Sequence, residues 1–485
     1  MPSTLTDRSV TIAMPMDSRG HRQLRDAGRV SVLIAALCLI SSCARSLPDF
    51  PRLDLGRFQP EIRKAVEQQA DQAKANPRDA NQVLRLGMVL HAHDQFQAAA
   101  QCYSRAHSLG PMRFETLYYW GQALASMGDS KGAAERLRQA LAIRPTSLPA
   151  RLKLAEVLRE SAESASSAEL YRQVLKEAPE NASAHYGLGR LLDGAEAITE
   201  FQKALALFPR YGAGQFALAT AYRKIGETKK AQELLNDYER DKTLIPPLDD
   251  PEMAAVRALN LSAAGLLSQA AELEKEGRLA EALERHNRAV GMDPKLVDAY
   301  VNLISLYGRL QRDLEAEQAY KQVIALDPNR AEAYYNFGVF CFERQRLSEA
   351  KTAFEAAARL NPRHAEALHN GAVILEREGK WDQAAALYHR ALAVKPSYPL
   401  AHFHLGRLYA NQNKYALAIQ EFERSLEPAG AETPTYLYAL AATNARAGAR
   451  GRAVELMRQA RAQAFARGQT ALAASIDHDL AALAR

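Results

Sequence analysis

The sequence predicts an all-α protein built from stacked pairs of helices, and two observations support this prediction. Strong helix formers dominate the composition, with Ala, Leu, Glu, Arg and Gln crowding out Thr, Val and Ile. Prolines recur every 34 residues, in one set at 77, 111, 145 and 179 and in a second set at 294, 328, 362 and 396. A fixed interval of this length is typical of helical repeat proteins.

Each 34-residue repeat places small and large side chains at fixed positions. Two helices of about 12 to 15 residues are marginal alone, but small residues let them approach closely while large residues fill the gaps. Stacked copies then bury one continuous core. The aligned residues are Tyr334, Phe337, Gly338, Ala350, Phe354, Ala357 and Pro362 in 331–364; Leu405, Gly406, Tyr409, Ala418 and Phe422 in 399–432; and Leu117, Trp120, Gly121 and Ala133 in 114–147.

This pattern resembles the tetratricopeptide repeat, W-x2-L-G-x2-Y…A-x3-F…P, over nearly everything after residue 60. The resemblance implies a right-handed α-solenoid of helix-turn-helix repeats, in which the first helix of each repeat lines a concave groove. Turn residues stand between the two helices of a repeat, as glycine is expected to do at a helix C-terminus. They are Gly128, Gly226, Gly277 and Gly379.

The repeats predict two arrays. We count eleven repeats between residues 80 and 468. The chain then consists of an N-terminal array with a leading half-repeat over 58–242, a Pro-rich break over 243–251, a C-terminal array over 252–468 and a capping helix over 469–485. Two prolines in series, at 246 and 247, cannot continue a helix. We therefore expect a hinge or a kink between the arrays.

Two repeats depart from the pattern. The repeat over 182–211 is four residues short near Asp193 and Gly194, so we expect its helices to pair more tightly. In the repeat over 365–398, Gly371 and Ala372 replace the usual Leu-Gly, which weakens one core contact.

The N-terminus has the order of an export signal. An apolar run of eleven residues, Val30 to Ile40, follows Arg29 and precedes small residues, and it is too short for a membrane-spanning helix, which needs about 20 residues. The tetrad Ile40-Ser41-Ser42-Cys43 resembles the bacterial lipoprotein box. This resemblance implies a signal peptide over 1–43, lipidation of Cys43, a tether over 44–57 and a membrane-tethered protein of the periplasm or envelope. Cleavage after Ala44 or an uncleaved signal anchor are the alternatives.

Charge and cysteine content exclude several classes. The net charge of +6 is small for this length, and basic residues alternate with acids along helix faces, so we expect no nucleic-acid partner. None of the four cysteines has a paired spacing, which argues against a zinc site or a disulfide framework. Cys102 and Cys341 fall at helical positions that we expect to be buried.

The candidate binding site is a set of polar residues at the sixth position of successive first helices. Asn302, Asn336 and Asn370 recur at intervals of 34 and are followed by His404. Because a side-chain amide both donates and accepts, such residues can hold an extended peptide by its backbone. The set resembles the asparagine ladder in the repeat domain of O-linked N-acetylglucosamine transferases. The alternative is that Asn is simply frequent at this position of the repeat.

Neighbouring positions would add rings and acids to the groove. The fifth positions carry Tyr335, His369 and Phe403, and the second positions carry Asp298, Glu332 and Glu366. The N-terminal array has no ladder, so a ligand there would be bound differently or not at all. Its sixth positions are Arg85, Tyr119, Lys153, Gly187 and Ala217.

No catalytic motif is present, so we expect neither an enzyme nor a cofactor. His402 and His404, like His364 and His369, lack metal-ligand spacing, and we interpret all four as surface residues with no metal site. Phosphate-binding loops and G-x-S-x-G or H-E-x-x-H motifs do not occur in the sequence.

The sequence therefore predicts a non-enzymatic scaffold that binds a protein or an extended peptide. One alternative is an accessory subunit that presents substrate to a separate enzyme, for example a glycosyltransferase. Another is a cytoplasmic adaptor whose apolar N-terminus reflects a misassigned start.

Overall fold

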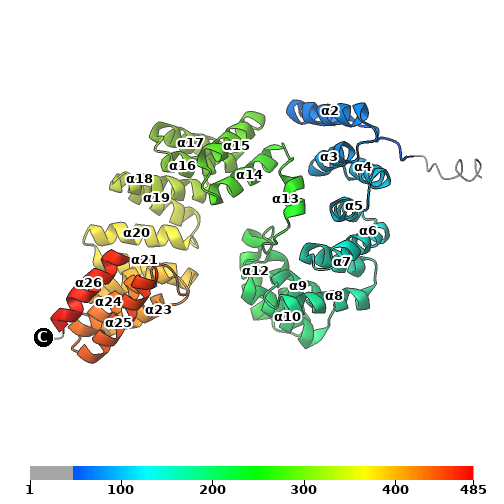
Figure 1. Cartoon of the computed structure of the whole chain (residues 1–485). Coiled ribbons are helices and arrows are strands. Elements are labelled where there is room, and N and C mark those ends of the chain that lie inside the picture. The colour runs from blue at the N-terminus through cyan, green and yellow to red at the C-terminus, as the bar shows by residue number, and fades with distance from the viewer. Residues whose placement is uncertain (1–46, 484–485) are drawn as a thin grey trace, which may run out of the picture. The chain divides into compact units, whose positions relative to one another are not determined.

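A computed structural model describes residues 47–483 of the chain. Within these residues there are twenty-five α-helices, one short 3-10 helix and no strand, so the predicted all-α fold is confirmed. The chain divides into two compact bodies, one ending at Asn260 and one beginning at Leu261, which we call the N-terminal and C-terminal arrays (Figure 1). Each is described by itself below. None of the described helices is both long enough and apolar enough to cross a membrane.

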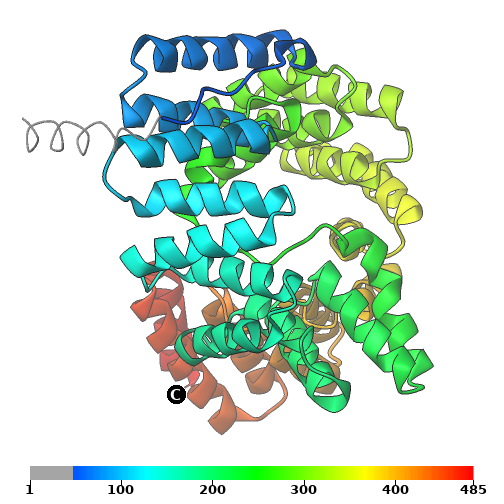
Figure 2. The ribbon, with the colours of Figure 1, turned by 90° about the vertical axis from the view of Figure 1, so that its right-hand side faces the viewer.

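The N-terminal array holds a leading helix, five helix pairs and a short final helix. Its elements are η1 (Leu55–Arg57), α2 (Pro60–Ala75), α3 (Ala80–Ala92), α4 (Phe96–Leu109), α5 (Phe114–Ser126), α6 (Ser130–Ile143), α7 (Leu148–Glu160), α8 (Ser164–Glu177), α9 (Ala182–Gly189), α10 (Gly194–Leu207), α11 (Gly212–Lys224), α12 (Thr228–Asp241) and α13 (Pro251–Arg257). Figure 2 shows the helices of the first repeats stacked in layers. Residues 252–260, which the repeat pattern assigned to the other array, lie in this one.

The C-terminal array holds six helix pairs and a closing helix. Its elements are α14 (Ala263–Lys275), α15 (Leu279–Met292), α16 (Val297–Arg309), α17 (Asp313–Leu326), α18 (Ala331–Glu343), α19 (Leu347–Leu360), α20 (Ala365–Arg377), α21 (Trp381–Val394), α22 (Pro399–Asn411), α23 (Tyr415–Ser425), α24 (Thr433–Arg446), α25 (Arg450–Ala466) and α26 (Thr470–Leu483). Each first helix packs most closely on the second helix of its own repeat, and α18, α20, α22 and α24 then pack on the preceding repeat.

The turn between the two helices of a repeat needs a residue in the left-handed backbone region. The four glycines predicted as turn residues all have φ between 72° and 82°. Five repeats place another residue there, with φ between 57° and 60°: Asp94, Ala162, Gln311, Gln345 and Asn413. Because a Cβ disfavours this conformation, these five turns are mildly strained compared with the glycine turns.

Within a repeat, a glycine on the first helix makes room for a ring on the second. A Cβ added to Gly338 would lie 2.7 Å from a ring carbon of Phe354, and one added to Gly87 would lie 2.7 Å from a ring carbon of Tyr103. Both rings are almost completely buried. The small-residue positions of the sequence pattern therefore set how closely the two helices approach.

The closing proline of one repeat is tied to the first helix of the next. The residue six positions after the proline donates a side-chain hydrogen bond to the proline carbonyl. The pairs are Arg151 with Pro145 at 2.6 Å, His185 with Pro179 at 2.9 Å, Gln215 with Pro209 at 3.0 Å, Tyr334 with Pro328 at 3.1 Å and His402 with Pro396 at 2.9 Å. This bond satisfies a carbonyl at the repeat boundary, and several different side chains make it.

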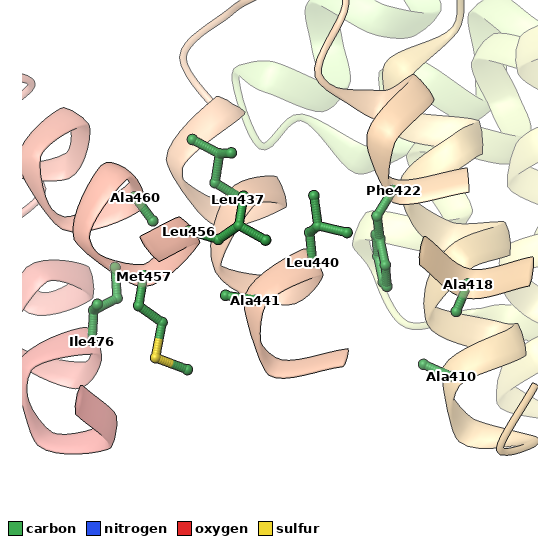
Figure 3. Close-up of a cluster of buried hydrophobic side chains, with 10 residues drawn as sticks. All are labelled: Ala410, Ala418, Phe422, Leu437, Leu440, Ala441, Leu456, Met457, Ala460 and Ile476. Carbon is green, nitrogen blue, oxygen red and sulfur yellow. The ribbon is translucent and has the colours of Figure 1, made fainter. Parts of the chain in front are cut away.

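Stacking continues to the last helix of the C-terminal array. Leu440 on α24 faces Phe422 on α23, while Leu456 on α25 lies on the other side of α24 (Figure 3). Ile476 on α26 is completely buried against this cluster. The closing helix therefore covers the apolar side that the last repeat would otherwise expose to solvent.

The two departures from the repeat have visible consequences. In the short repeat the loss falls on the helix itself, since α9 has eight residues where other first helices have thirteen or more. Beside it lies a hollow of about 630 Å³ whose wall includes half-exposed Phe216. The hollow is lined by the next repeat as well, while a Cβ added to Gly189 on α9 would lie 2.7 Å from a ring carbon of Phe201 on α10, so the two helices of the short repeat approach each other closely. Gly371 borders a second hollow of about 230 Å³, as expected for a missing leucine.

Candidate functional site

The ladder residues lie at matching places on four successive first helices. Asn302, Asn336, Asn370 and His404 are carried by α16, α18, α20 and α22, and all four side chains are half-buried. We call the surface that they form the ladder face. Helix α16 contacts α18 directly, and α20 contacts α22, so the sixth positions follow one another along the stack.

Each ladder residue from Asn336 onward reaches back to the fifth position of the preceding repeat. The Asn336 amide donates to the carbonyl oxygen of Val301 at 3.0 Å. The Asn370 amide donates to the Tyr335 hydroxyl. His404 and His369 complete the series, with ring centroids 5.1 Å apart in an edge-to-face arrangement. The ladder therefore also joins repeats together.

This second role limits what a ligand could use. The Asn370 carbonyl oxygen also lies 3.0 Å from Nδ1 of His369, so both ends of that amide are engaged. Asn336 keeps its carbonyl oxygen and one N–H free of partners among the described residues. Within residues 47–483 the Asn302 amide makes no hydrogen bond at all. Since an amide can make about four hydrogen bonds, Asn302 and Asn336 hold most of the unused capacity.

The three acids of the predicted site are ion-paired inside the array. Arg330 lies 2.6 Å from Asp298 and 2.9 Å from Glu332, and Lys395 lies 3.0 Å from Glu366. The hydrogen bond to His364, together with Lys395, holds the pKa of Glu366 well below its usual range. These carboxylates therefore neutralise neighbouring cations on the array rather than forming a free acidic strip.

The histidines are not the surface residues that the sequence suggested. His369 is 2% exposed and His402 is 6% exposed, so that prediction is wrong for both. Burial lowers the pKa of His369, and burial together with His369 and Arg407 lowers the pKa of His404 to about 3. His402 is held by Glu421, with 2.6 Å between Nδ1 and Oε2.

The rings of the predicted site form a layer behind the amides. Tyr335 and Phe403 are half-buried, and Phe403 packs on Tyr436 with ring centroids 4.8 Å apart. Tyr335 packs on His364 at 4.5 Å. His369 is enclosed among neighbouring rings and does not reach the surface. Of the predicted rings, Tyr335 and Phe403 are the ones that a ligand could touch.

A polar network beside His404 was not found from the sequence. The Tyr388 hydroxyl donates to Glu376 at 3.0 Å, Arg407 lies 3.1 Å from the same carboxylate, and Arg407 donates to Nδ1 of His404 at 2.9 Å. Equivalent contacts join His91 to Tyr103 and Glu274 to His286. All three pairs are separated by twelve residues, a spacing that could have indicated them.

The N-terminal array presents different sixth positions, as expected. Arg85 is exposed, Tyr119 is 4% exposed and Lys153 pairs with Glu156 at 2.9 Å. Gly187 is buried and Ala217 borders the hollow next to α9. Cys102 and Cys341 are buried free thiols, which confirms the expectation for both. Among the described residues no three His, Cys, Asp or Glu side chains are grouped as metal ligands would be.

Comparison of the sequence with models of known protein families agrees with the repeat geometry. Models described as tetratricopeptide repeat match residues 115–147, 152–194, 297–330, 314–370 and 369–434. These matches fall on helix pairs of both arrays and include every ladder residue.

The matched helix pairs, which lie in both arrays, are tetratricopeptide repeats.

Three solved structures are similar to parts of this chain. PilF from Pseudomonas aeruginosa is 17% identical, with 45% of this chain and 97% of that chain covered and a TM-score of 0.40. PilW, described as a type IV pilus biogenesis factor, is 22% identical over 41% of this chain and 92% of that chain, with a TM-score of 0.38. Yeast Tom70 is 15% identical over 76% of this chain and 96% of that chain, with a TM-score of 0.40. No curated protein matches the sequence.

Proposed function

We propose that this tetratricopeptide repeat protein is a non-enzymatic scaffold whose ladder face binds an extended segment of a protein partner. Tetratricopeptide repeat proteins typically act in protein–protein interaction, which gives the proposal its class. The observation that carries it to this surface is the unused hydrogen-bonding capacity of Asn302 and Asn336.

An extended peptide has one N–H and one C=O on each residue, and both need partners when the peptide is removed from water. The Asn302 amide can donate to a peptide carbonyl and accept from a peptide N–H at once, and Asn336 can accept through its free oxygen. Half-buried Tyr335 and Phe403 offer apolar surface next to the amides. Such a site holds a backbone with little dependence on side-chain sequence.

Site-specific crosslinking tests this proposal. A photo-crosslinking amino acid in place of exposed Ser305, one turn after Asn302 on α16, should attach a partner in the native host, and the matched substitution at Asn329, exposed in the loop before α18, should not. Adding Asn302→Ala to the chain with the crosslinker at 305 should weaken capture several-fold while leaving helical circular dichroism unchanged. Equal capture at 305 and 329 would remove the ladder face from the proposal. A partner enzyme recovered in fixed ratio would favour a substrate-presenting role.

We also propose that the chain is exported and tethered to a membrane by a lipid on Cys43. Cys43 and the signal segment lie outside the described residues. The end of the predicted tether is docked, because Arg105 donates to the Pro48 carbonyl at 2.6 Å and stacks 4.3 Å from the Phe50 ring. A lipid five residues before Pro48 would keep the array within roughly 20 Å of the membrane surface.

Mass spectrometry of the mature N-terminus tests the tether. A mature chain beginning at lipid-modified Cys43 is expected, and Cys43→Ser should abolish both the modification and the membrane-bound fraction. A mature chain beginning at residue 45 without lipid, or one that keeps the apolar segment, would replace the lipid anchor with one of the two alternatives.

A further inference from the structure

Residues 248–257 lie on the first-helix face of the N-terminal array. Their helix α13 packs against α3 and α5, which are the first helices of the first two repeats (Figure 1). In the C-terminal array the corresponding helices carry the ladder. A segment of the chain itself therefore occupies the kind of surface on which repeats of this family present their binding residues.

The first anchor of this segment is a buried carboxylate. The Tyr118 hydroxyl, at the fifth position of its repeat, donates to Oδ2 of Asp250 at 2.6 Å. Gln122, one turn further along α5, donates to the same hydroxyl at 2.8 Å. Tyr118 is 1% exposed and Asp250 is 8% exposed. The other oxygen of Asp250 accepts from the Met253 N–H at 3.0 Å, so Asp250 also starts helix α13.

The second anchor is an ion pair. Glu252 contacts the Arg144 guanidinium, which lies 3.9 Å above the Phe114 ring and 2.8 Å from Glu115. The ring and Glu115 together hold the guanidinium in place for a second carboxylate. Burial and the nearby carboxylates, Glu252 first, raise the pKa of Tyr119 to about 12, which places Tyr119 beside the same charges.

The third anchor is apolar. Val256, one turn after Glu252 on the same side of α13, is 2% exposed. Beyond the helix, the backbone of Leu259 hydrogen-bonds His93 at the end of α3. The surface thus accepts an aspartate, a glutamate two residues later and a valine four residues after that, all within one short helical segment.

This segment depends on the surface for its structure. A helix of seven residues is far below the length that is stable alone in water. Its outer side, including Asp249, Pro251 and Ala254, is exposed, so the few contacts described above carry most of its stability. Segments with so few buried contacts open locally far more often than the array unfolds.

We propose that the face of α3 and α5 binds an acidic helical segment of a partner protein, and that residues 248–257 are a copy of that segment carried by the chain. Charge complementarity selects the partner, since a hydroxyl and a guanidinium are placed to receive two carboxylates. The tethered copy competes at an effective concentration on the order of millimolar, so a partner gains access only when it binds more tightly or when α13 is released. This proposal is independent of the ladder face.

Fluorescence anisotropy with a labelled synthetic peptide of residues 246–260 tests the proposal on the full-length chain. The wild-type chain should bind weakly, and the chain carrying Asp250→Ala and Glu252→Ala should bind roughly tenfold or more tightly because its own copy is weakened. Asp249→Ala, which removes the neighbouring exposed carboxylate, is the matched control and should behave as wild type. A scrambled peptide of the same composition should not bind.

Adding Tyr118→Phe and Arg144→Gln to the released chain should abolish peptide binding. Binding that survives these changes, or no binding by a released chain with wild-type circular dichroism, overturns the proposal. If the released chain does not fold, hydrogen exchange of the wild-type chain provides the test instead. Excess peptide should speed amide exchange in 251–257 of the wild-type chain, and unchanged exchange at saturating peptide would also overturn the proposal.

Discussion

The two arrays use the same repeat but treat the first-helix face differently. In each, a cation near the end of a repeat pairs with the acid 29 residues earlier: Arg144 with Glu115 at 2.8 Å and Lys395 with Glu366 at 3.0 Å. In the N-terminal array that cation also holds Glu252 of α13. In the C-terminal array the helices packed on α18 and α20 are their neighbours in the stack. One repeat pattern therefore supports two kinds of first-helix face: one is covered by a segment of its own array, and the other, among the described helices of the C-terminal array, is packed only by neighbours in the stack.

The largest effects should come from the shared packing of glycine under a ring. Gly87→Ala in the N-terminal array and Gly338→Ala in the C-terminal array should each lower the free energy of unfolding by roughly 1–3 kcal/mol, because the added Cβ overpacks the core. In both cases the nearest ring carbon is 2.7 Å away. Denaturant unfolding followed by circular dichroism measures the loss.

Gly371→Ala is the matched control for these two variants. Its added Cβ would lie 3.5 Å from Leu387, which is ordinary contact, beside a hollow of about 230 Å³. This change should raise stability by about 1 kcal/mol through helix propensity. A loss at Gly371, or clearly unequal losses at Gly87 and Gly338, would show that the arrays do not share one packing rule.

Acid should destabilise both arrays through their buried histidines. Burial lowers the pKa of His91 to about 4, and burial with nearby charge lowers that of His404 to about 3. Each group is neutral when folded and takes up a proton on unfolding below about pH 6.5, so stability falls as the pH drops from 6.5 toward the folded pKa. The slope should approach about 1.4 kcal/mol per pH unit for each group. His91→Gln and His404→Gln should flatten it, and an unchanged slope would contradict the assignment.

Stability should rise when glycine replaces another residue at the left-handed turn position, and it should fall when glycine is removed from that position. Ala162→Gly and Gln345→Gly should stabilise by several tenths to about 1 kcal/mol, because both residues have φ near 60°. Gly379→Ala should cost about 1 kcal/mol. Thermal unfolding compares the three variants, and stabilisation by Gly379→Ala would exclude turn strain as the cause.

The smallest changes in stability should distinguish the first-helix face that α13 covers from the corresponding face of the C-terminal array. Lys395→Ala removes an exposed ion pair and should cost about 0.5 kcal/mol or less. Arg144→Ala also leaves Glu252 without its cation and should cost roughly 1 kcal/mol more. Equal costs, measured by denaturant unfolding, would mean that α13 adds nothing to the stability of the N-terminal array.

Sequence reasoning captured the features that periodicity determines. Proline spacing and the small-residue positions predicted paired helices, and Gly371 predicted a poorly filled contact. The ladder residues fall on successive first helices, as their spacing predicted, but their back-contacts to Val301 and Tyr335 depend on side-chain conformations that spacing does not determine. His369 and His402 were misplaced, because polar partners such as Glu421 make a buried histidine acceptable.

The Pro-rich break shows a different limit. No described helix runs through its two consecutive prolines, since α12 ends at Asp241 and α13 begins at Pro251. A repeat pattern, however, describes contacts between neighbours and contains no information about a segment that folds back. The contact of Asp250 with Tyr118 spans 132 residues. Only the acidic run Asp249-Asp250 and the tyrosine at a fifth position were visible, and nothing in the sequence joins them.

The bond from a first helix to the preceding proline carbonyl bears on how such chains diverge. Arginine, histidine, glutamine and tyrosine all make it here, so any long donor of suitable reach is acceptable at that place. Chemically unlike residues can therefore replace one another at this boundary between repeats while the helices stay stacked.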